Sequence, residues 1–534
     1  MPKNLAKSSS ECCRREERSF FMNSNNCSSG LLSARRAEDE GMKKIAPEER
    51  PAFHLTAPAG WLNDPNGFSF YGGEYHLFFQ YNPYAAHWDK MHWGHAVTGD
   101  LLKWTYCPAA LAPDSVLDEG GCFSGSAVEL GDGRQLLMYT GLTPVPNKGG
   151  NPEKDICEPD AQKAPEYYQV QNIAIGDGRD YVKYEKNPVI GSNMLPEDSD
   201  PHQFRDPKII PLKDGSYGVL TVCMGEDGLG RVLLFQSSDC FSWHFLRELY
   251  RNDGHFGLMW ECPDFFELDG KWFLMISPMD MSRKGFEYHN GYESMVFAGS
   301  LDEKTLEFKP DYDQCVDYGI DFYAAQTMSA PDGRRIMIGW MQNWETRAMI
   351  PEDVSWAGQM TIPRELSFHD GRLCQQPVRE ISRYYGSTVF YRKVPVSDEI
   401  DLYGVDGRII DLDVTVSPAG DEPLYRYFVI RFAMDEEHYS EAMYSPDTGI
   451  FVISRESSGT RKGLLHQQSC LVPESIDGNL SVRILLDRYS FEIFINDGRY
   501  VMSAVIYTDP GADRISFRAG GKAIIDVAKR GINI

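Results

Sequence analysis

From about residue 51 onward, short apolar or alternating segments recur along the chain, and long amphipathic helical patterns are absent. The clearest segments are YHLFFQY, RQLLMYTG, YGVLTVCM, RVLLFQSS, KWFLMISPM and RRIMIGWM, and turn sequences such as DGR, DGS and LDGK separate them. Short strands between Gly- and Asp-rich turns are typical of an all-β architecture. The segments continue to about residue 365, which is too much chain for one ordinary sandwich and favours a propeller of several four-stranded blades.

A second β-rich region follows residue 385. It contains RIIDLDVTVSP, YRYFVIRFAM, SVRILLDRYSFEIFINDG and DRISFRAGG, with a hairpin turn predicted at 496–498. Its length and strand spacing favour a β-sandwich. We therefore expect a propeller over residues 49–365, a linker over 366–390 and a sandwich over 391–534.

The first 48 residues have a different character. They are polar, rich in Ser and Arg, and without a hydrophobic period. This composition predicts a disordered extension over residues 1–48. The change of character near Met42 suggests, as a hypothesis, that translation of the native protein starts there. The segment lacks an apolar stretch of signal-peptide length.

Charge and cysteine usage narrow the class of protein. The formal net charge is −25, which repels nucleic-acid phosphates and anionic lipid, so neither is an expected partner. The chain has no stretch of 18 apolar residues, so no membrane span is predicted. Twelve cysteines are scattered without a CxxC pair, which indicates free thiols in a reducing compartment and a cytoplasmic location.

Three carboxylates stand in unusual settings, each at the start of a strand-like segment. Asp64 lies in WLNDPNG, Asp206 lies in FRDPKII beside Arg205, and Glu261 lies in LMWECPDFF after Trp260. Taken singly, they could be a turn residue, half of a local ion pair and a rim charge. Side chains from different blades meet at the centre of a propeller, so the three together predict one shared site.

Paired carboxyl groups are the groups that cleave glycosidic bonds. Apolar neighbours and nearby negative charge raise the pKa of a carboxyl group, so Glu261 is the expected proton donor. The adjacent guanidinium of Arg205 predicts that Asp206 stays ionised and binds sugar hydroxyls. The histidines of HWDKMHWGH would diverge on a strand, so neither a metal nor another cofactor is expected.

The chain resembles glycoside hydrolase family 32, which includes invertases, sucrose-6-phosphate hydrolases and fructanases. The resemblance extends from about residue 51 to the C-terminus and rests on ordered motifs. These are WLNDPNG, FFQYNP, MHWGHAVTGDLLKW, GCFSGSAV, FRDP, WECPDFF, DFYAAQT, IGWM and TIPREL. It implies a five-bladed β-propeller followed by a C-terminal β-sandwich.

The resemblance also implies a role for each carboxylate. Asp64 is the expected nucleophile, which forms a covalent fructosyl-enzyme, and Glu261 is the expected acid and base. Asp206 would stabilise the transition state. Retention of configuration implies that the carboxyl groups of Asp64 and Glu261 lie about 5–5.5 Å apart. The residues expected around the sugar are Asn63, Gln80, Trp88, Phe123, Ser124, Arg205, Tyr323 and Trp340.

The resemblance leaves the substrate open. Sucrose and sucrose 6-phosphate are the leading candidates, an exo-acting fructanase on inulin or levan oligomers is the alternative, and an inactive fructan-binding protein is a remote one. The long polar loop from 144 to 165 is expected to shape the rim of the pocket. A homodimer formed through the sandwich is an alternative to a monomer.

Overall fold

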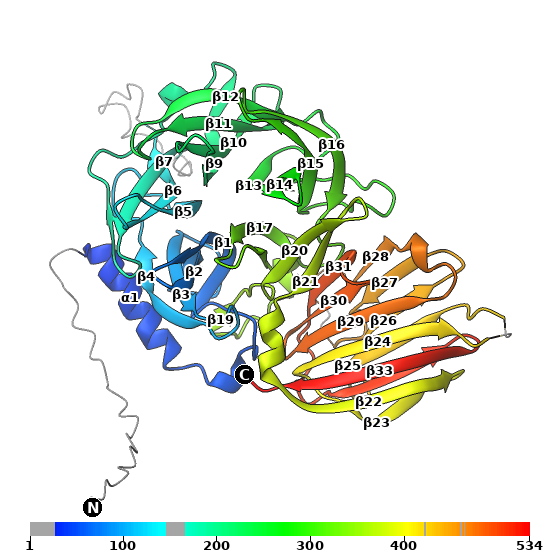
Figure 1. Cartoon of the computed structure of the whole chain (residues 1–534). Helices are drawn as coiled ribbons and strands as arrows, with labels where there is room; N and C mark the ends of the chain where they lie inside the picture. The colour runs from blue at the N-terminus through cyan, green and yellow to red at the C-terminus, as the bar shows by residue number, and fades with distance from the viewer. Residues whose placement is uncertain (1–26, 146–165, 421–422, 460–461, 464) are drawn as a thin grey trace, which may run out of the picture.

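The computed structural model describes residues 27–145, 166–420, 423–459, 462–463 and 465–534. These residues form an all-β molecule of seven sheets, as expected from the sequence. Five sheets surround a common centre, and the other two pack face to face beside them (Figure 1). This arrangement is consistent with a propeller and a sandwich. The predicted rim loop lies, for residues 146–165, outside the described residues.

The five sheets of the ring follow one another along the chain. The first has the order β19-β1-β2-β3-β4, in which β19 (Trp356–Ala357) pairs in parallel with β1. The fifth sheet has the order β17-β18-β20-β21, because β19 belongs to the first sheet although it lies between β18 and β20 in the sequence. The strands are β1 (Gly60–Tyr71), β2 (Glu74–Asn82), β3 (His92–Thr98), β4 (Thr105–Leu111), β5 (Cys122–Glu129), β6 (Gln135–Pro144), β7 (Tyr167–Gly176), β8 (Tyr181–Lys183), β9 (Ser199–Pro211), β10 (Tyr217–Gly225), β11 (Gly230–Ser237), β12 (His244–Arg251), β13 (Trp260–Leu268), β14 (Lys271–Pro278), β15 (Met295–Asp302), β16 (Glu307–Cys315), β17 (Tyr323–Ser329), β18 (Arg335–Trp340), β20 (Arg364–His369) and β21 (Arg372–Pro377).

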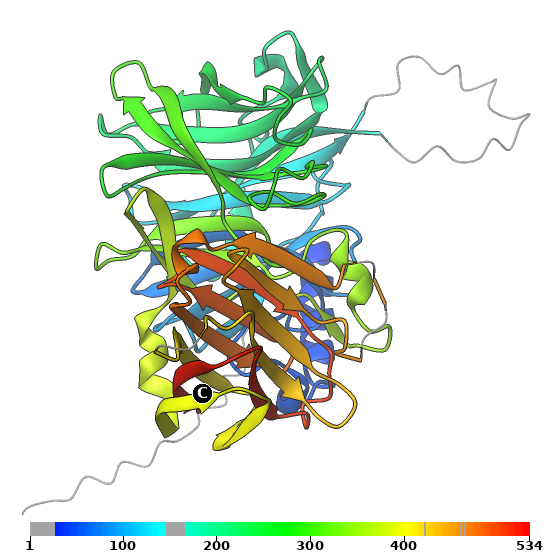
Figure 2. The same ribbon diagram turned by 90° about the vertical axis from the view of Figure 1, so that its right-hand side faces the viewer.

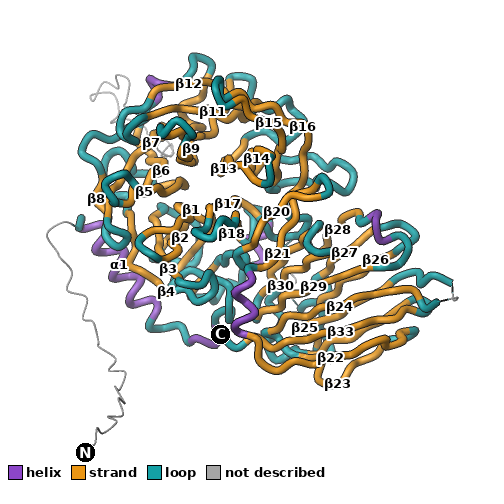
Figure 3. The backbone as a smooth tube through the Cα atoms, in the orientation of Figure 1, coloured by secondary structure: helices purple, strands orange, loops and turns teal. Residues whose placement is uncertain are grey.

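The first strand of each sheet lies closest to the centre of the ring. These strands contact one another in a closed cycle, β1 to β5, β5 to β9, β9 to β13, β13 to β17 and β17 back to β1. The tube drawing shows them around the middle of the ring (Figure 3). Side chains that are distant in the sequence can therefore meet there.

The two remaining sheets have six strands each, in the orders β22-β33-β24-β29-β30-β31 and β23-β32-β25-β26-β27-β28. Figure 2 shows them layered beside the ring. Buried apolar residues between them include Leu412, Ile430, Ile484 and Phe517. The strands are β22 (Tyr385–Val396), β23 (Ile400–Asp406), β24 (Ile410–Pro418), β25 (Phe428–Met434), β26 (Ser440–Ser445), β27 (Ile450–Ser454), β28 (Gln467–Leu471), β29 (Leu480–Asp487), β30 (Ser490–Ile495), β31 (Tyr500–Val505), β32 (Arg514–Ala519) and β33 (Ala523–Ile532).

The segment expected as a linker over 366–390 is instead mostly regular structure. Strands β20 and β21 complete the fifth sheet of the ring, and β22 begins at Tyr385. The 3₁₀ helix η4 (Arg379–Tyr384) lies between β21 and β22. The other 3₁₀ helices are η1 (Pro47–Glu49), η2 (Ser192–Met194), η3 (Thr346–Met349) and η5 (Pro473–Ser475).

The expectation that residues 1–48 are disordered is wrong for α1 (Ser29–Met42), and residues 1–26 lie outside the described residues. The helix packs on β4, the outer edge strand of the first sheet. Arg35 Nε donates to the carbonyl of Ala109 at 3.0 Å, and the amide of Ala109 donates to Glu38 Oε2 at 3.0 Å. The helix thus covers an edge that would otherwise expose unpaired backbone groups.

A buried group of five side chains, which we call the interface network, joins the ring to the sandwich. It comprises His54, Asp317 and Arg364 from the ring and Asp487 and Glu492 from the sandwich. His54 contacts Asp487 at 2.8 Å and Glu492 at 2.9 Å. Arg364 contacts Glu492 at 2.5 Å and Asp317 at 2.9 Å.

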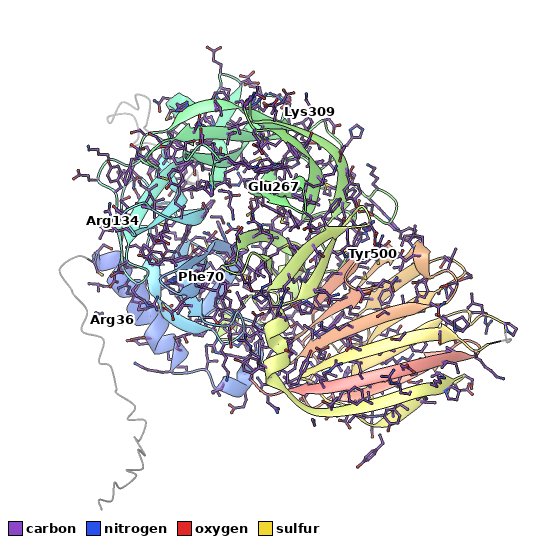
Figure 4. All side chains as sticks on the ribbon, in the orientation of Figure 1. Arg36, Phe70, Arg134, Glu267, Lys309 and Tyr500 are labelled. Carbon is purple, nitrogen blue, oxygen red and sulfur yellow. The ribbon has the colours of Figure 1, made fainter. Side chains whose placement is uncertain are left out.

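An aromatic contact lies beside this network. The Arg372 guanidinium stands 4.6 Å from the ring centroid of Tyr500. Figure 4 shows Tyr500 where the sandwich meets the ring, whereas Arg36 lies on the distant helix α1.

In the described part of the chain, no helix combines the length and apolarity needed to cross a membrane.

Candidate active site

Each central strand of the ring carries an extra residue relative to its neighbour close to the centre of the ring. Such β-bulges bend a strand and redirect the side chains beside it. The bulges lie between Leu62 and Pro65 in β1, Phe123 and Gly125 in β5, Arg205 and Lys208 in β9, Glu261 and Asp264 in β13, and Tyr323 and Gln326 in β17. All three predicted carboxylates lie at these bulges.

Backbone strain accompanies three of the bulges. Asp206, Cys262 and Ala324 have φ angles of +61°, +49° and +55°. Non-glycine residues rarely adopt this left-handed conformation, which costs on the order of 1 kcal/mol or more. Strain of this kind persists where surrounding structure holds it, and it is concentrated here around the centre of the ring.

The bulges open onto a cavity of about 440 Å³. Nine of the eleven predicted site residues line it, and the three carboxylates are among them. The lining residues are Asn63, Asp64, Gln80, Trp88, Phe123, Ser124, Gln169, Gln203, Arg205, Asp206, Glu261, Met279, Tyr292, Trp344 and Arg347.

Tyr323 and Trp340, the other two predicted residues, lie one layer behind the cavity. Tyr323 is buried, and its hydroxyl donates to Glu261 Oε2 at 2.7 Å. Trp340 is fully buried and packs edge-to-face against Trp61 and Trp344. Neither side chain lines the cavity itself.

Asp64 accepts three side-chain hydrogen bonds. Asn63 Nδ2 donates to Oδ1 at 2.9 Å, Ser124 Oγ donates to Oδ2 at 2.7 Å, and Cys262 Sγ lies 3.6 Å from Oδ2. Burial and the charge of Glu261 raise the pKa of Asp64, and these hydrogen bonds oppose the rise. Hydrogen bonds to both oxygens fix the orientation of the carboxylate toward the cavity.

Asp206 lies in β9, the central strand of the third sheet of the ring. Its Oδ2 accepts the backbone N–H of Cys262 at 2.9 Å, and its own amide donates to Thr140 Oγ1 at 2.9 Å. Burial raises the pKa of Asp206 to about 7, although Arg205 opposes the rise. Arg205 therefore favours the ionised form of Asp206 as expected, from a distance of 4.0 Å between Nε and Oδ2, but burial has the larger effect.

Arg205 instead makes its closer contacts with Glu261. Its Nε and Nη2 donate to Glu261 Oε1 at 3.2 and 3.1 Å. Its Nη1 donates to Gln203 Oε1 at 2.6 Å, and Gln169 Oε1 lies 3.5 Å away. Together with the hydroxyl of Tyr323 on Oε2, these contacts hold the Glu261 carboxyl group in place.

Aromatic side chains form the outer part of the cavity. Trp88 is 41% exposed, and its ring centroid lies 6.2 Å from Phe123 and 6.3 Å from Trp344. Deeper in the cavity, Gln80 is anchored by its Nε2, which donates to the carbonyl of Cys122 at 3.1 Å. Aromatic faces with a few fixed polar groups suit the binding of a sugar ring.

Cys262 is next to the proposed acid but is not suited to act as a nucleophile. Its thiol is buried, and burial together with the surrounding carboxylates raises its pKa well above the usual value. A thiol nucleophile needs a lowered pKa. Cys262 therefore serves as a hydrogen-bond donor to the two aspartates.

Sequence reasoning missed six residues of the lining: Gln169, Gln203, Met279, Tyr292, Trp344 and Arg347. Trp344 and Arg347 follow the recognised IGWM segment within seven residues. That proximity was the available signal for them. Gln169 and Gln203 had none, because their position depends on contact with Arg205.

Comparison with known proteins agrees with this geometry. The family model described as Glycosyl hydrolases family 32 N-terminal domain matches residues 54–377, and the one described as Glycosyl hydrolases family 32 C terminal matches 384–529. A raffinose invertase and a sucrose-6-phosphate hydrolase, both from Escherichia coli, are each 34% identical, covering 89% of this chain and 93% of the relative.

A solved structure shows the same similarity in three dimensions. The β-fructofuranosidase of Bombyx mori superposes with a TM-score of 0.77 at 33% identity, covering 94% of this chain and 98% of that one. The fold and the cavity thus define a glycoside hydrolase of the β-fructofuranosidase class. The chain belongs to glycosyl hydrolase family 32.

Proposed function

We propose that this enzyme is a retaining β-fructofuranosidase that releases the terminal β-D-fructofuranosyl unit of sucrose or sucrose 6-phosphate. The observation that carries the proposal is the meeting of Asp64, Asp206 and Glu261 in one cavity. Two carboxyl groups with distinct surroundings are the requirement for glycoside cleavage. The names of the relatives, raffinose invertase and sucrose-6-phosphate hydrolase, support this substrate class.

In the proposed mechanism, Asp64 attacks the anomeric carbon of the fructosyl unit. Its two oxygens are oriented by Asn63 and Ser124. Glu261 donates a proton to the leaving oxygen, and the fructosyl group becomes bonded to Asp64 Oδ. Glu261 then takes a proton from water, which attacks the anomeric carbon and releases β-fructose. Asp206 binds fructose hydroxyls during both steps.

The remaining predicted residues act on the substrate in two ways. Gln80 and Arg205 present polar groups to the sugar, and Trp88 and Phe123 present aromatic surfaces. Tyr323 acts through Glu261, and Trp340 acts by packing behind Trp344.

The architecture that we propose is a five-bladed propeller in which each of the five ring sheets is one blade. The closed cycle of contacts between the five central strands supports it. We place the boundary between propeller and sandwich between β21 and β22, at residues 378–384. We also propose a cytoplasmic location. It is supported by the nine described cysteines, all of which are free and eight of which are buried.

An exo-acting fructanase is the second candidate. A levanase from Bacillus subtilis is 33% identical over 500 residues, which favours this alternative, although the match covers only 69% of that protein. An inactive fructan-binding protein is disfavoured because binding alone does not require three carboxylates that line one cavity.

The test is kcat/KM for sucrose, sucrose 6-phosphate and short inulin oligomers, measured side by side. We expect the sucrose-type substrates to be hydrolysed fastest and the first fructose released to be the β-anomer by NMR. Preferred cleavage of inulin oligomers would favour the fructanase, and absence of turnover on all three would refute the proposed function. Asp447→Asn, at an exposed turn of the sandwich, is a control variant.

A further inference from the structure

The cavity contains a second arginine that the mechanism above does not use. Arg347 lies in η3 (Thr346–Met349), and it lines the cavity together with Trp88 and Trp344. The three carboxylates line its inner part, whereas Arg347 is exposed to solvent. A terminal fructosyl unit at the carboxylates directs the rest of its substrate toward the exposed end, so Arg347 faces the leaving group.

Stacking holds the Arg347 side chain in place. Its guanidinium carbon stands 5.3 Å from the ring centroid of Trp344. Trp344 in turn packs edge-to-face against Trp340 at 5.2 Å and against Trp88 at 6.3 Å. A stacked guanidinium loses less side-chain freedom when it binds a ligand, and its planar set of donors matches a phosphate group.

The charge of Arg347 is also uncompensated by its surroundings. Of the described residues that line the cavity, only Arg205 and Arg347 carry a positive charge. Arg205 is engaged with Glu261, whereas Arg347 forms no ion pair with any carboxylate in the described ranges. Glu345 is close in sequence, but it lines a neighbouring hollow.

Tyr292 links Arg347 to the reacting end of the cavity. Tyr292 lines the cavity, and burial together with carboxylates that include Glu261 raises its pKa, while the cation of Arg347 opposes the rise. Both charges therefore act on the same hydroxyl. The guanidinium and the carboxylates line one cavity.

We infer that Arg347, held by Trp344, binds a phosphate monoester on the leaving sugar and makes this enzyme selective for a phosphorylated disaccharide. The inference rests on the proposed function and specifies its substrate. It predicts that the neutral disaccharide is a poorer substrate because Arg347 then has no anion to bind. The groups that cleave the bond are the same for both substrates.

The experiment compares kcat/KM for sucrose 6-phosphate and sucrose in the wild type and in Arg347→Ala, Arg347→Lys and Trp344→Phe. A hydrogen-bonded charge contact corresponds to roughly a 10- to 100-fold change. We expect Arg347→Ala to lose that much on sucrose 6-phosphate and less than about threefold on sucrose. Lysine keeps the charge without the planar fork, so Arg347→Lys should be intermediate.

Arg518→Ala is the matched control. Arg518 is an exposed arginine that stacks on Tyr427 at 5.8 Å in the sandwich. Its loss should leave the ratio of the two substrates unchanged. Competitive inhibition by glucose 6-phosphate supplies a binding readout, and its inhibition constant should rise in Arg347→Ala while that of glucose stays constant.

The outcomes separate the inference from the proposed function. If the wild type hydrolyses both sugars with a ratio that Arg347→Ala does not change, the inference is wrong and the proposed function stands. Equal losses on both sugars would also overturn it, because Arg347 would then bind sugar hydroxyls. If the wild type hydrolyses neither sugar, the proposed function itself fails.

Discussion

The cavity and the interface network each contain three carboxylates, but they differ in how many cations contact those carboxylates. In the interface network, two cations, His54 and Arg364, contact the carboxylates directly. In the cavity, Arg205 is the only cation in contact with a carboxylate among the described lining residues. Fewer cations therefore contact the carboxylates of the cavity than those of the interface network.

The pKa shifts follow this difference at the two network carboxylates that contact His54. Despite burial, contacts with His54 lower the pKa of Asp487, and contacts with Arg364 and His54 lower that of Glu492. Burial raises the pKa of the third network carboxylate, Asp317, although Arg364 opposes the rise. In the cavity, burial raises the pKa values of Asp64 and Asp206. The comparison teaches that the two network carboxylates in contact with His54 are held ionised, whereas the cavity favours proton exchange at Asp64 and Asp206, at the expense of stability.

The largest expected effect is on turnover. Asp64→Asn removes the proposed nucleophile while it keeps the size of the side chain and its contact with Ser124. We expect kcat to fall by a factor on the order of 10⁴. Thermal unfolding should show no loss of stability, because the substitution removes a buried charge. Unchanged kcat would refute the assignment.

Glu261→Gln should lower kcat by about 10²–10⁴-fold on sucrose-type substrates. The loss should be much smaller on a fructoside with a leaving group that needs no protonation, at least for the first step. Pre-steady-state release of the leaving group measures this. Equal losses on both kinds of substrate would contradict the role of Glu261 as the acid.

The interface network should show the opposite pattern. Arg364→Met leaves Asp317 without its cation and Glu492 with His54 alone, and it is expected to lower the free energy of unfolding by about 3–5 kcal/mol. Arg392→Met is the control, because its pair with Asp526 is on the surface and should contribute less than about 1 kcal/mol. Denaturant unfolding measures both, and a similar loss in the two variants would contradict the account.

His54 makes the stability of this interface depend on pH. Hydrogen bonds and the charges of Asp487 and Glu492 raise its pKa to about 9, against burial. The stabilisation is complete below its ordinary pKa and is lost as the pH rises through about 9. We expect the advantage of the wild type over His54→Gln to shrink by about 3 kcal/mol between those limits. A constant difference across this range would show that His54 stays neutral.

Asp206 gives a pH dependence in a lower window, of which the part between about pH 5.5 and 8 is the smaller effect. Since its folded-state pKa is raised to about 7, its contribution to stability is complete below its ordinary pKa and is lost as the pH rises through about 7. Relative to Asp206→Asn, the wild type should lose about 2 kcal/mol between about pH 5.5 and 8. If the difference does not vary with pH, Asp206 is not a neutral carboxyl group near pH 6.

The sequence was sufficient for the site where local motifs carry the chemistry. WLNDPNG, FRDP and WECPD each place a carboxylate at the bulge of a central strand. The residues next to each carboxylate within these motifs could be predicted for the same reason. The partner of Arg205 could not be predicted, because adjacency in the chain suggested Asp206 while the fold brings Arg205 to Glu261 of the next sheet.

Helix α1 was missed for a related reason. Its buried face contains Leu31 and Ala34, but also Arg35 and Glu38. Charged residues break the apolar period by which such a helix is recognised. They are buried because they satisfy both backbone groups of Ala109, a long-range pairing that no local pattern reveals.

The most direct test of the central claim is to trap the covalent intermediate. The Glu261→Gln variant would be mixed with β-fructofuranosyl fluoride, whose leaving group needs no acid, then quenched, digested and analysed by peptide mass spectrometry. We predict one added fructosyl unit on the peptide that contains Asp64, and none when Asp64→Asn is combined with Glu261→Gln. Labelling at Asp206, or fluoride release without any labelled peptide, would contradict the account.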